Sequence, residues 1–151
     1  MRTSSILFVV SVIFLAILAA ACTQSPQNGT VTPTATNLPG TPGPNIATGP
    51  TDTVPEYYYT ALEVSRNTLS FNPTIRVTFR GGAGMNFVNA LDVQVIRSDG
   101  IMETASLSRP HVGDFVELRG TTGKDRVIVT MQLINGDSYK IYDKVLEFRV
   151  D

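Results

Sequence analysis

The side chains best suited to nucleophilic or metal chemistry occur only once each in this chain. Cys22 is the only cysteine and His111 the only histidine among 151 residues. A lone thiol cannot form an intramolecular disulfide or a multi-cysteine zinc site, and a lone imidazole lacks partners for a histidine metal cluster. His111 lies in a predicted turn. Its only conceivable catalytic partners are serine and aspartate residues that no motif places beside it. We therefore expect no catalytic residue, no metal site and no cofactor.

Cys22 follows a segment whose composition predicts export. Arg2 is the only charge before it, and residues 6–21 are apolar except for Ser11. As a helix this run would span about 24 Å, short of the roughly 30 Å hydrocarbon core of a bilayer. A short positive start, an apolar run and small residues at its end are typical of a signal peptide, which we place at residues 1–21.

The end of this segment, Leu18-Ala19-Ala20-Ala21-Cys22, resembles the lipobox of prokaryotic lipoproteins. It departs from the commonest pattern in having alanine, not leucine, three residues before the cysteine. The resemblance implies that the Cys22 thiol is lipidated and that this residue becomes the mature N-terminus. The alternative is an uncleaved signal anchor in which Cys22 is incidental. Either arrangement attaches the protein to the cell membrane and places the rest of the chain on the extracytoplasmic side.

The next segment, residues 22–55, has the composition of a disordered linker. From Thr23 to Pro55 it holds nine Thr, seven Pro and four Gly, with Asp52 as its only charge and no aromatic residue. Such a stretch cannot bury enough apolar surface to offset the entropy lost on ordering. Asn28 begins the only N-x-[ST] sequon without an intervening proline, so it is the candidate for N-glycosylation.

Residues 56–151 carry nearly all the charge and alternate between apolar and polar side chains. The clearest alternation occurs in residues 62–65, 75–80, 91–95, 116–118 and 127–133. A period of two predicts half-buried antiparallel strands, and no helical stripe is present. We expect an all-β domain, an immunoglobulin-like sandwich of about seven strands, with a small β-barrel as the alternative.

Asn135-Gly136 gives the strongest turn signal between these strands. We expect a type I′ turn with positive φ at both residues. The apolar residues of segment 127–133 would then lie opposite Tyr139 and Ile141.

Other residues in the predicted loops suggest chemistry only weakly. Gly81-Gly82-Ala83-Gly84 is glycine-rich, but a β segment comes after it where a phosphate-binding loop needs a helix, so it predicts a strand-connecting turn. Five aspartates in or near turns could offer oxygen ligands to calcium, but no D-x-[DN]-x-[DN]-G motif is present. They are Asp99, Asp114, Asp125, Asp137 and Asp143. We expect these residues to stabilise turns, and Asp125 to form an exposed ion pair with Arg126.

Tyr57-Tyr58-Tyr59 is the most unusual local feature, at the junction of linker and domain. One interpretation is an aromatic patch that stacks on sugars or docks an envelope protein. The other is that one or two of the rings anchor the linker to the first strand. We keep Tyr57, Tyr58 and Tyr59 as a candidate binding patch.

Four motifs in the domain carry a further resemblance. They are Ile75-x-Val77-x-Phe79-x-Gly81-Gly82-x-Gly84, Ser98-Asp99-Gly100, Gly120-Thr121-x-Gly123-x-Asp125-Arg126-Val127 and Tyr139-Lys140-Ile141-x-Asp143. Together with the lipobox and linker, they resemble an uncharacterised family of exported lipoproteins of methanogenic archaea. The resemblance implies a membrane-anchored small β domain and brings no activity or catalytic residue.

The charge balance excludes one class of partner. Twelve Lys+Arg against thirteen Asp+Glu give a net charge of −1, without the basic excess that binds nucleic acid. We expect a lipid-anchored, surface-exposed, non-catalytic module that binds a protein, a glycan or another envelope component. A small exported hydrolase or a calcium-binding domain is the alternative.

Overall fold

The computed structural model describes residues 34–37 and 44–149. The predicted signal peptide, Cys22 and Asn28 lie outside these residues, so their roles stay predictions. No helix in the described ranges is long and apolar enough to cross a membrane. The elements are β1 Thr34–Asn37, η1 Glu56–Tyr58, β2 Ala61–Arg66, β3 Thr74–Gly81, η2 Met85–Phe87, β4 Val88–Ile96, β5 Ile101–Ser108, β6 Phe115–Arg119, β7 Lys124–Leu133 and β8 Ser138–Glu147, where η denotes a 3-10 helix.

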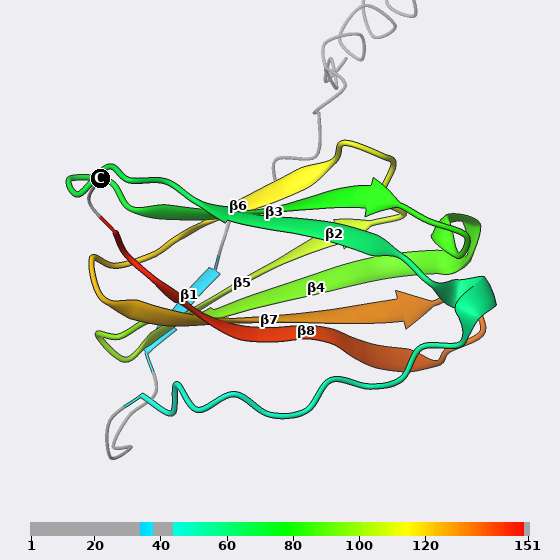
Figure 1. The fold of residues 1–151 in the computed structure, drawn as a ribbon, viewed down its shortest axis with the longest axis horizontal. Coiled ribbons are helices and arrows are strands. Elements are labelled where there is room, and N and C mark those ends of the chain that lie inside the picture. Colours follow the sequence, from blue (N-terminus) through cyan, green and yellow to red (C-terminus); the bar gives the residue numbers. More distant parts are fainter. Residues whose placement is uncertain (1–33, 38–43, 150–151) are drawn as a thin grey trace, which may run out of the picture.

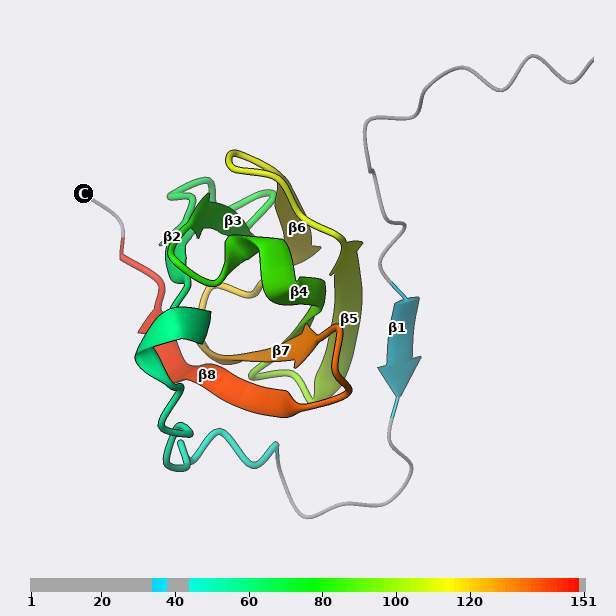
Figure 2. The same ribbon diagram turned by 90° about the vertical axis from the view of Figure 1, so that its right-hand side faces the viewer.

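The strands form two antiparallel sheets that face each other (Figures 1 and 2). The smaller sheet has the order β2-β3-β6 and the larger has the order β1-β5-β4-β7-β8. The seven strands from β2 onward confirm the predicted immunoglobulin-like sandwich. The fourth of these seven, β5, pairs with the third, β4, and so belongs to the larger sheet. Because the two sheets stay separate, the alternative of a closed barrel is excluded for the described residues.

The core fills the space between the sheets with the apolar half of each alternating segment. The fully buried positions on β3, β4 and β7 occur at every second residue. They are Ile75, Val77 and Phe79, then Leu91, Val93 and Val95, then Val127, Val129 and Met131. The domain has no disulfide among its described residues, so this apolar packing is the main source of stability.

Charged side chains of neighbouring strands form ion pairs on the outer face of the smaller sheet. Arg76 on β3 lies 2.8 Å from Glu117 on β6, and Arg80 pairs with Glu63 on β2. All four side chains are exposed. Exposed pairs of this kind contribute little to stability, and they keep the outer face soluble.

The β7–β8 hairpin occurs where Asn135-Gly136 predicts it, but the turn type differs from the prediction. The loop has three residues, because Leu133 N donates to Asp137 O at 2.9 Å and Gly136 N donates to Leu133 O at 3.0 Å. Gly136 has a φ of +93°, whereas Asn135 is not in the positive-φ region. This is a type I turn closed by a glycine bulge, and it needs only one left-handed residue.

The register of this hairpin also departs from the prediction. Met131 does lie opposite Tyr139, but Val129 lies opposite Tyr142. A register shift between Val129 and Thr130 leaves Ile141 as an extra residue on β8. Such a bulge bends the edge strand, which explains why strict alternation fails there.

Residues 44–55, which composition assigns to the disordered linker, lie against the sheet. Asp52 N donates to Lys140 O at 2.8 Å, and Lys140 N donates to the Asp52 carboxylate at 2.6 Å. Gly49 N donates to the Asp143 carboxylate at 3.1 Å. Figure 1 shows this segment in cyan, running alongside the red edge strand β8. The structure differs from the sequence-based expectation here, because unpaired edge groups of β8 supply the hydrogen bonds that an isolated linker lacks.

Candidate functional site

Exposed apolar side chains (Tyr57, Tyr59, Phe87 and Ile134) gather around the half-buried Tyr58 at one end of the sandwich, which we call the apolar end. Figure 2 looks onto this end, with η1 in front. The Tyr58 ring lies 4.2 Å from the Tyr57 ring and 5.2 Å from the Phe87 ring, measured between centroids. Ile134 N donates to Phe87 O at 2.9 Å, which brings the β7–β8 turn beside η2. The side chains of Tyr57, Tyr59 and Ile134 are 61%, 58% and 64% exposed.

The glycine-rich segment 81–84 positions the tyrosines by allowing two backbones to touch. Gly84 N donates to Tyr59 O at 2.9 Å. A Cβ atom on Gly84 would lie 2.3 Å from the carbonyl carbon of Tyr58, which is too close for any side chain. Gly82 has a φ of +134°, and a Cβ atom on it would lie 2.5 Å from the Tyr59 carbonyl oxygen. These glycines therefore connect β3 to η2. Because they lack side chains, the backbone of residues 57–59 can pack directly against them.

The three tyrosines divide between the two roles considered for them, as an anchor of the preceding segment and as an exposed binding patch. Tyr58 is half-buried against the core and its hydroxyl accepts from Asn135 Nδ2 at 3.5 Å. Desolvation raises the pKa of Tyr58, and the neighbouring Tyr57 and Asp137 raise it further. Tyr58 is thus the anchor of the segment, whereas Tyr57 and Tyr59 remain open to solvent.

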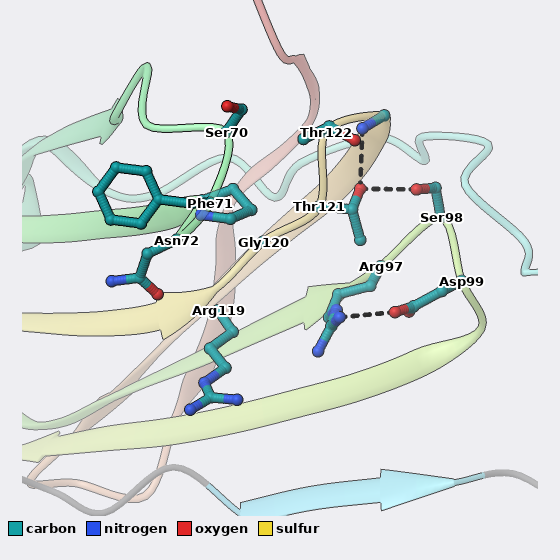
Figure 3. A pocket seen from close by; sticks show the side chains of 12 residues that line it. Ser70, Phe71, Asn72, Arg97, Ser98, Asp99, Arg119, Gly120, Thr121 and Thr122 are labelled. Atoms are coloured by element: carbon teal, nitrogen blue, oxygen red, sulfur yellow. Dashed lines mark hydrogen bonds and ion pairs between the residues drawn. The ribbon is translucent and has the colours of Figure 1, made fainter.

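A groove of about 710 Å³ crosses the opposite end of the sandwich, which we call the groove end. Figure 3 shows the β2–β3 loop along one side of this groove and the β4–β5 loop along the other, with the start of the β6–β7 connection between them. The lining residues are Ser70, Phe71, Asn72, Pro73, Arg97, Ser98, Asp99, Arg119, Gly120, Thr121, Thr122 and Gly123. Eight of these twelve residues have polar side chains, which makes hydrogen bonding the dominant chemistry of the groove.

A fully buried carboxylate holds the loops of the groove end together. The Asp125 side chain has no exposed surface. It accepts hydrogen bonds from Arg66 Nη2 at 2.7 Å, Ser98 N at 2.9 Å, Thr121 N at 2.7 Å and Thr121 Oγ1 at 2.7 Å. The predicted exposed pair with Arg126 is wrong, because adjacent residues of a strand point to opposite faces of the sheet. The Asp125 side chain points inward, and its hydrogen bonds to Ser98 and Thr121 hold together two of the loops that line the groove.

A second buried carboxylate, Asp143, lies beneath the 44–55 segment. Arg126 donates to it through Nε at 2.7 Å and Nη2 at 2.6 Å, and Lys140 Nζ lies 3.2 Å away. The hydrogen bonds from Arg126 hold the pKa of Asp143 far below its ordinary value. Desolvation acts against this shift, whereas Gly49 N–H and Lys140 add to it. This cluster fastens the segment to β8.

The remaining sequence candidates take local structural roles. Asp99 Oδ1 accepts from Ile101 N at 3.1 Å, and Asp114 Oδ2 accepts from His111 N at 2.8 Å, which are turn-stabilising bonds. His111 is an exposed loop residue beside Asp114. Within the described ranges, no group of three His, Cys, Asp or Glu side chains could hold a metal ion.

Sequence reasoning missed several residues at both ends. Phe87 and Ile134 join the tyrosines only because the β3–β4 and β7–β8 connections meet in space. Phe71 looks like one apolar residue in a loop, yet it stands beside the groove and is 85% exposed. The only local signal was the presence of large apolar residues in segments rich in turn formers.

The fold and these two surfaces define the class of the chain, an immunoglobulin-like β-sandwich with loop surfaces at both ends. No family model, no curated protein and no solved structure matches this chain. The resemblance to exported archaeal lipoproteins therefore stays a prediction from the sequence.

Proposed function

We propose that this protein is a lipid-anchored, non-catalytic binding module of the cell envelope, and that its apolar end docks a partner protein. The observation that carries the proposal is the clustering of Tyr57, Tyr59, Phe87 and Ile134 at one end of the sandwich. Aromatic residues are enriched in protein interfaces, and contiguous exposed apolar surface commonly marks a docking site. In immunoglobulin-like folds the loops at one end of the sandwich are a common place for such a surface.

The docking proposal is tested with two variants of the full chain. Tyr57→Ser combined with Ile134→Ser removes two exposed anchors, and Phe115→Ser removes an exposed ring on the outer face of β6. We expect envelope protein captured by the wild type to be captured equally by Phe115→Ser. Capture by the double variant should fall by about ten-fold or more, as for loss of interface anchors. Equal capture by the double variant would refute docking at the apolar end.

The anchoring proposal is tested separately at Cys22. In a host that lipidates exported proteins, the wild type should partition into the detergent phase after processing. Cys22→Ala should remain an unprocessed precursor. Stable anchoring would need at least two acyl chains, because one chain gives only marginal membrane binding. A Cys22→Ala chain with the same mature N-terminus and the same membrane association would contradict lipidation.

A further inference from the structure

We propose that the groove end binds an uncharged polysaccharide chain, with Phe71 as the ring on which a sugar stacks. A sugar presents apolar C–H faces together with many hydroxyl groups. Its recognition therefore requires an exposed aromatic surface beside convergent hydrogen-bonding groups. This site lies at the opposite end of the sandwich from the apolar end and does not depend on protein docking there.

The Phe71 side chain is exposed on a well-braced loop. Asn67 Nδ2 donates to Asn72 O at 2.8 Å, and Asn67 Oδ1 accepts from Thr74 N at 2.9 Å. Asn72 N also donates to Leu69 O at 3.1 Å. Because these bonds fix the backbone on both sides of Phe71, its ring is presented to solvent by a defined turn. Water around an exposed ring is released when an apolar sugar face covers it.

The groove also offers free hydrogen-bonding groups. In residues 44–149, the Asn72 amide and the Arg119 guanidinium have no side-chain hydrogen bond or ion pair. The hydroxyls of Ser70 and Thr122 are likewise without partners in that range. An amide and a guanidinium are planar groups with two or more polar atoms in fixed geometry, which suits neighbouring hydroxyls of a sugar ring.

The side of the groove opposite Phe71 is held in place by hydrogen bonds and an ion pair among its own residues. Ser98 Oγ lies 2.6 Å from Thr121 Oγ1, which also accepts from Gly123 N at 3.0 Å. Arg97 Nη2 donates to Asp99 Oδ2 at 2.6 Å. Figure 3 marks these contacts opposite Phe71 and Asn72. A pre-formed side lowers the entropy cost of ordering the site when a ligand binds.

The charges around the groove balance, which selects a neutral ligand. Arg97 pairs with Asp99 and with the buried Glu103, and Glu103 also accepts from Arg119 N at 2.8 Å. The Arg97 guanidinium is thus paired with two carboxylates, whereas the Arg119 guanidinium is unpaired within residues 44–149, so these four side chains together carry no net formal charge. A site for a polyanion would instead need a net excess of cations. The polar lining equally disfavours an apolar small molecule.

The test uses the full-length chain in detergent and measures its electrophoretic retardation in native gels. The gels contain dextran, mannan or xylan as neutral probes, or dextran sulfate as the anionic probe. We expect at least one neutral polysaccharide to retard the wild type. Phe71→Ala should weaken that binding by about ten-fold, the change expected from losing one aromatic stacking contact. Arg119→Ala should also weaken it.

Two control variants test whether polysaccharide binding depends on the groove. Phe115→Ala removes an exposed ring outside the groove and should bind as the wild type does. The double variant Tyr57→Ser/Ile134→Ser should also bind normally, which separates this site from protein docking. Unfolding midpoints confirm that each variant is folded. The proposal is overturned if no neutral probe retards the chain, if Phe71→Ala binds like Phe115→Ala, or if dextran sulfate retards the chain more than every neutral probe.

Discussion

Within residues 44–149, three acidic side chains are buried in the sandwich, and each is matched by an arginine. Asp125 pairs with Arg66, Asp143 with Arg126, and Glu103 with Arg97. Burying a charge is costly, and a buried pair repays that cost only with good geometry and further hydrogen bonds. Asp125 and Asp143 both accept such additional bonds, from the β6–β7 connection and from residue 49. At the scale of single residues, these carboxylates determine where loops and the 44–55 segment attach.

The low pKa of Asp143 predicts a specific acid sensitivity. A carboxylate whose pKa is lower in the folded state stabilises the fold above its unfolded pKa of about 4, and this stability is lost as the pH falls further. Asp143→Asn should lower the free energy of unfolding by about 3 kcal/mol at pH 7, because Arg126 loses its charged partner. The variant should also lose less stability than the wild type below about pH 4.

Urea titrations at several pH values measure this effect. Glu117→Gln is the matched control, since its pair with Arg76 is exposed and should contribute less than about 1 kcal/mol. The same pH dependence in Asp143→Asn and in the wild type would contradict the role assigned to this carboxylate.

At the scale of elements, the β7–β8 hairpin depends on a single left-handed residue. Gly136 has a φ of +93° and open space around its Cα, so any cost of substitution comes from the backbone and not from a clash. Gly136→Val should destabilise the domain by about 1–3 kcal/mol, because a β-branched residue is strained at positive φ. Gly136→Asn should cost clearly less, since asparagine tolerates this conformation. Thermal unfolding of the two variants compares these costs, and equal midpoints would argue against the glycine bulge.

At this scale, the edge strands of the larger sheet also matter, because an open edge can pair with another chain. Without β1, the edge strands of the larger sheet would be β5 and β8, and residues that precede the sandwich lie along both of them. β1 pairs with β5 from Thr34 opposite Thr104 to Asn37 opposite Ile101, while residues 44–55 lie along β8. Covered edges resist pairing with other chains. The threonine- and proline-rich segment therefore contributes to the sheet it precedes.

At the scale of the whole molecule, the segment before η1 sets the boundary of the folding unit. A chain that begins at Glu56 and one that begins at Pro44 should both unfold cooperatively, because the core positions lie beyond Tyr57. The shorter chain should be less stable by about 2 kcal/mol, since it loses the hydrogen bonds of Gly49 and Asp52 to β8. It should also associate more readily through the uncovered edge.

Urea unfolding and light scattering on the two chains test this boundary. Identical midpoints would mean that residues 44–55 add nothing to the fold. A broad, non-cooperative transition of the longer chain would mean that the folding unit begins before Pro44.

The sequence alone determined which segments become strands and which side chains they bury, because alternation with a period of two is a local property of the chain. It also located the β7–β8 turn. It could not separate a sandwich from a barrel, since both bury one face of every strand. Tertiary structure decided that β5 joins β4, that Asp125 meets Arg66 across 59 residues of sequence, and that Phe71 and Arg119 line the same groove. The last two of these join segments far apart in the chain, and no local pattern encodes which distant loops will meet.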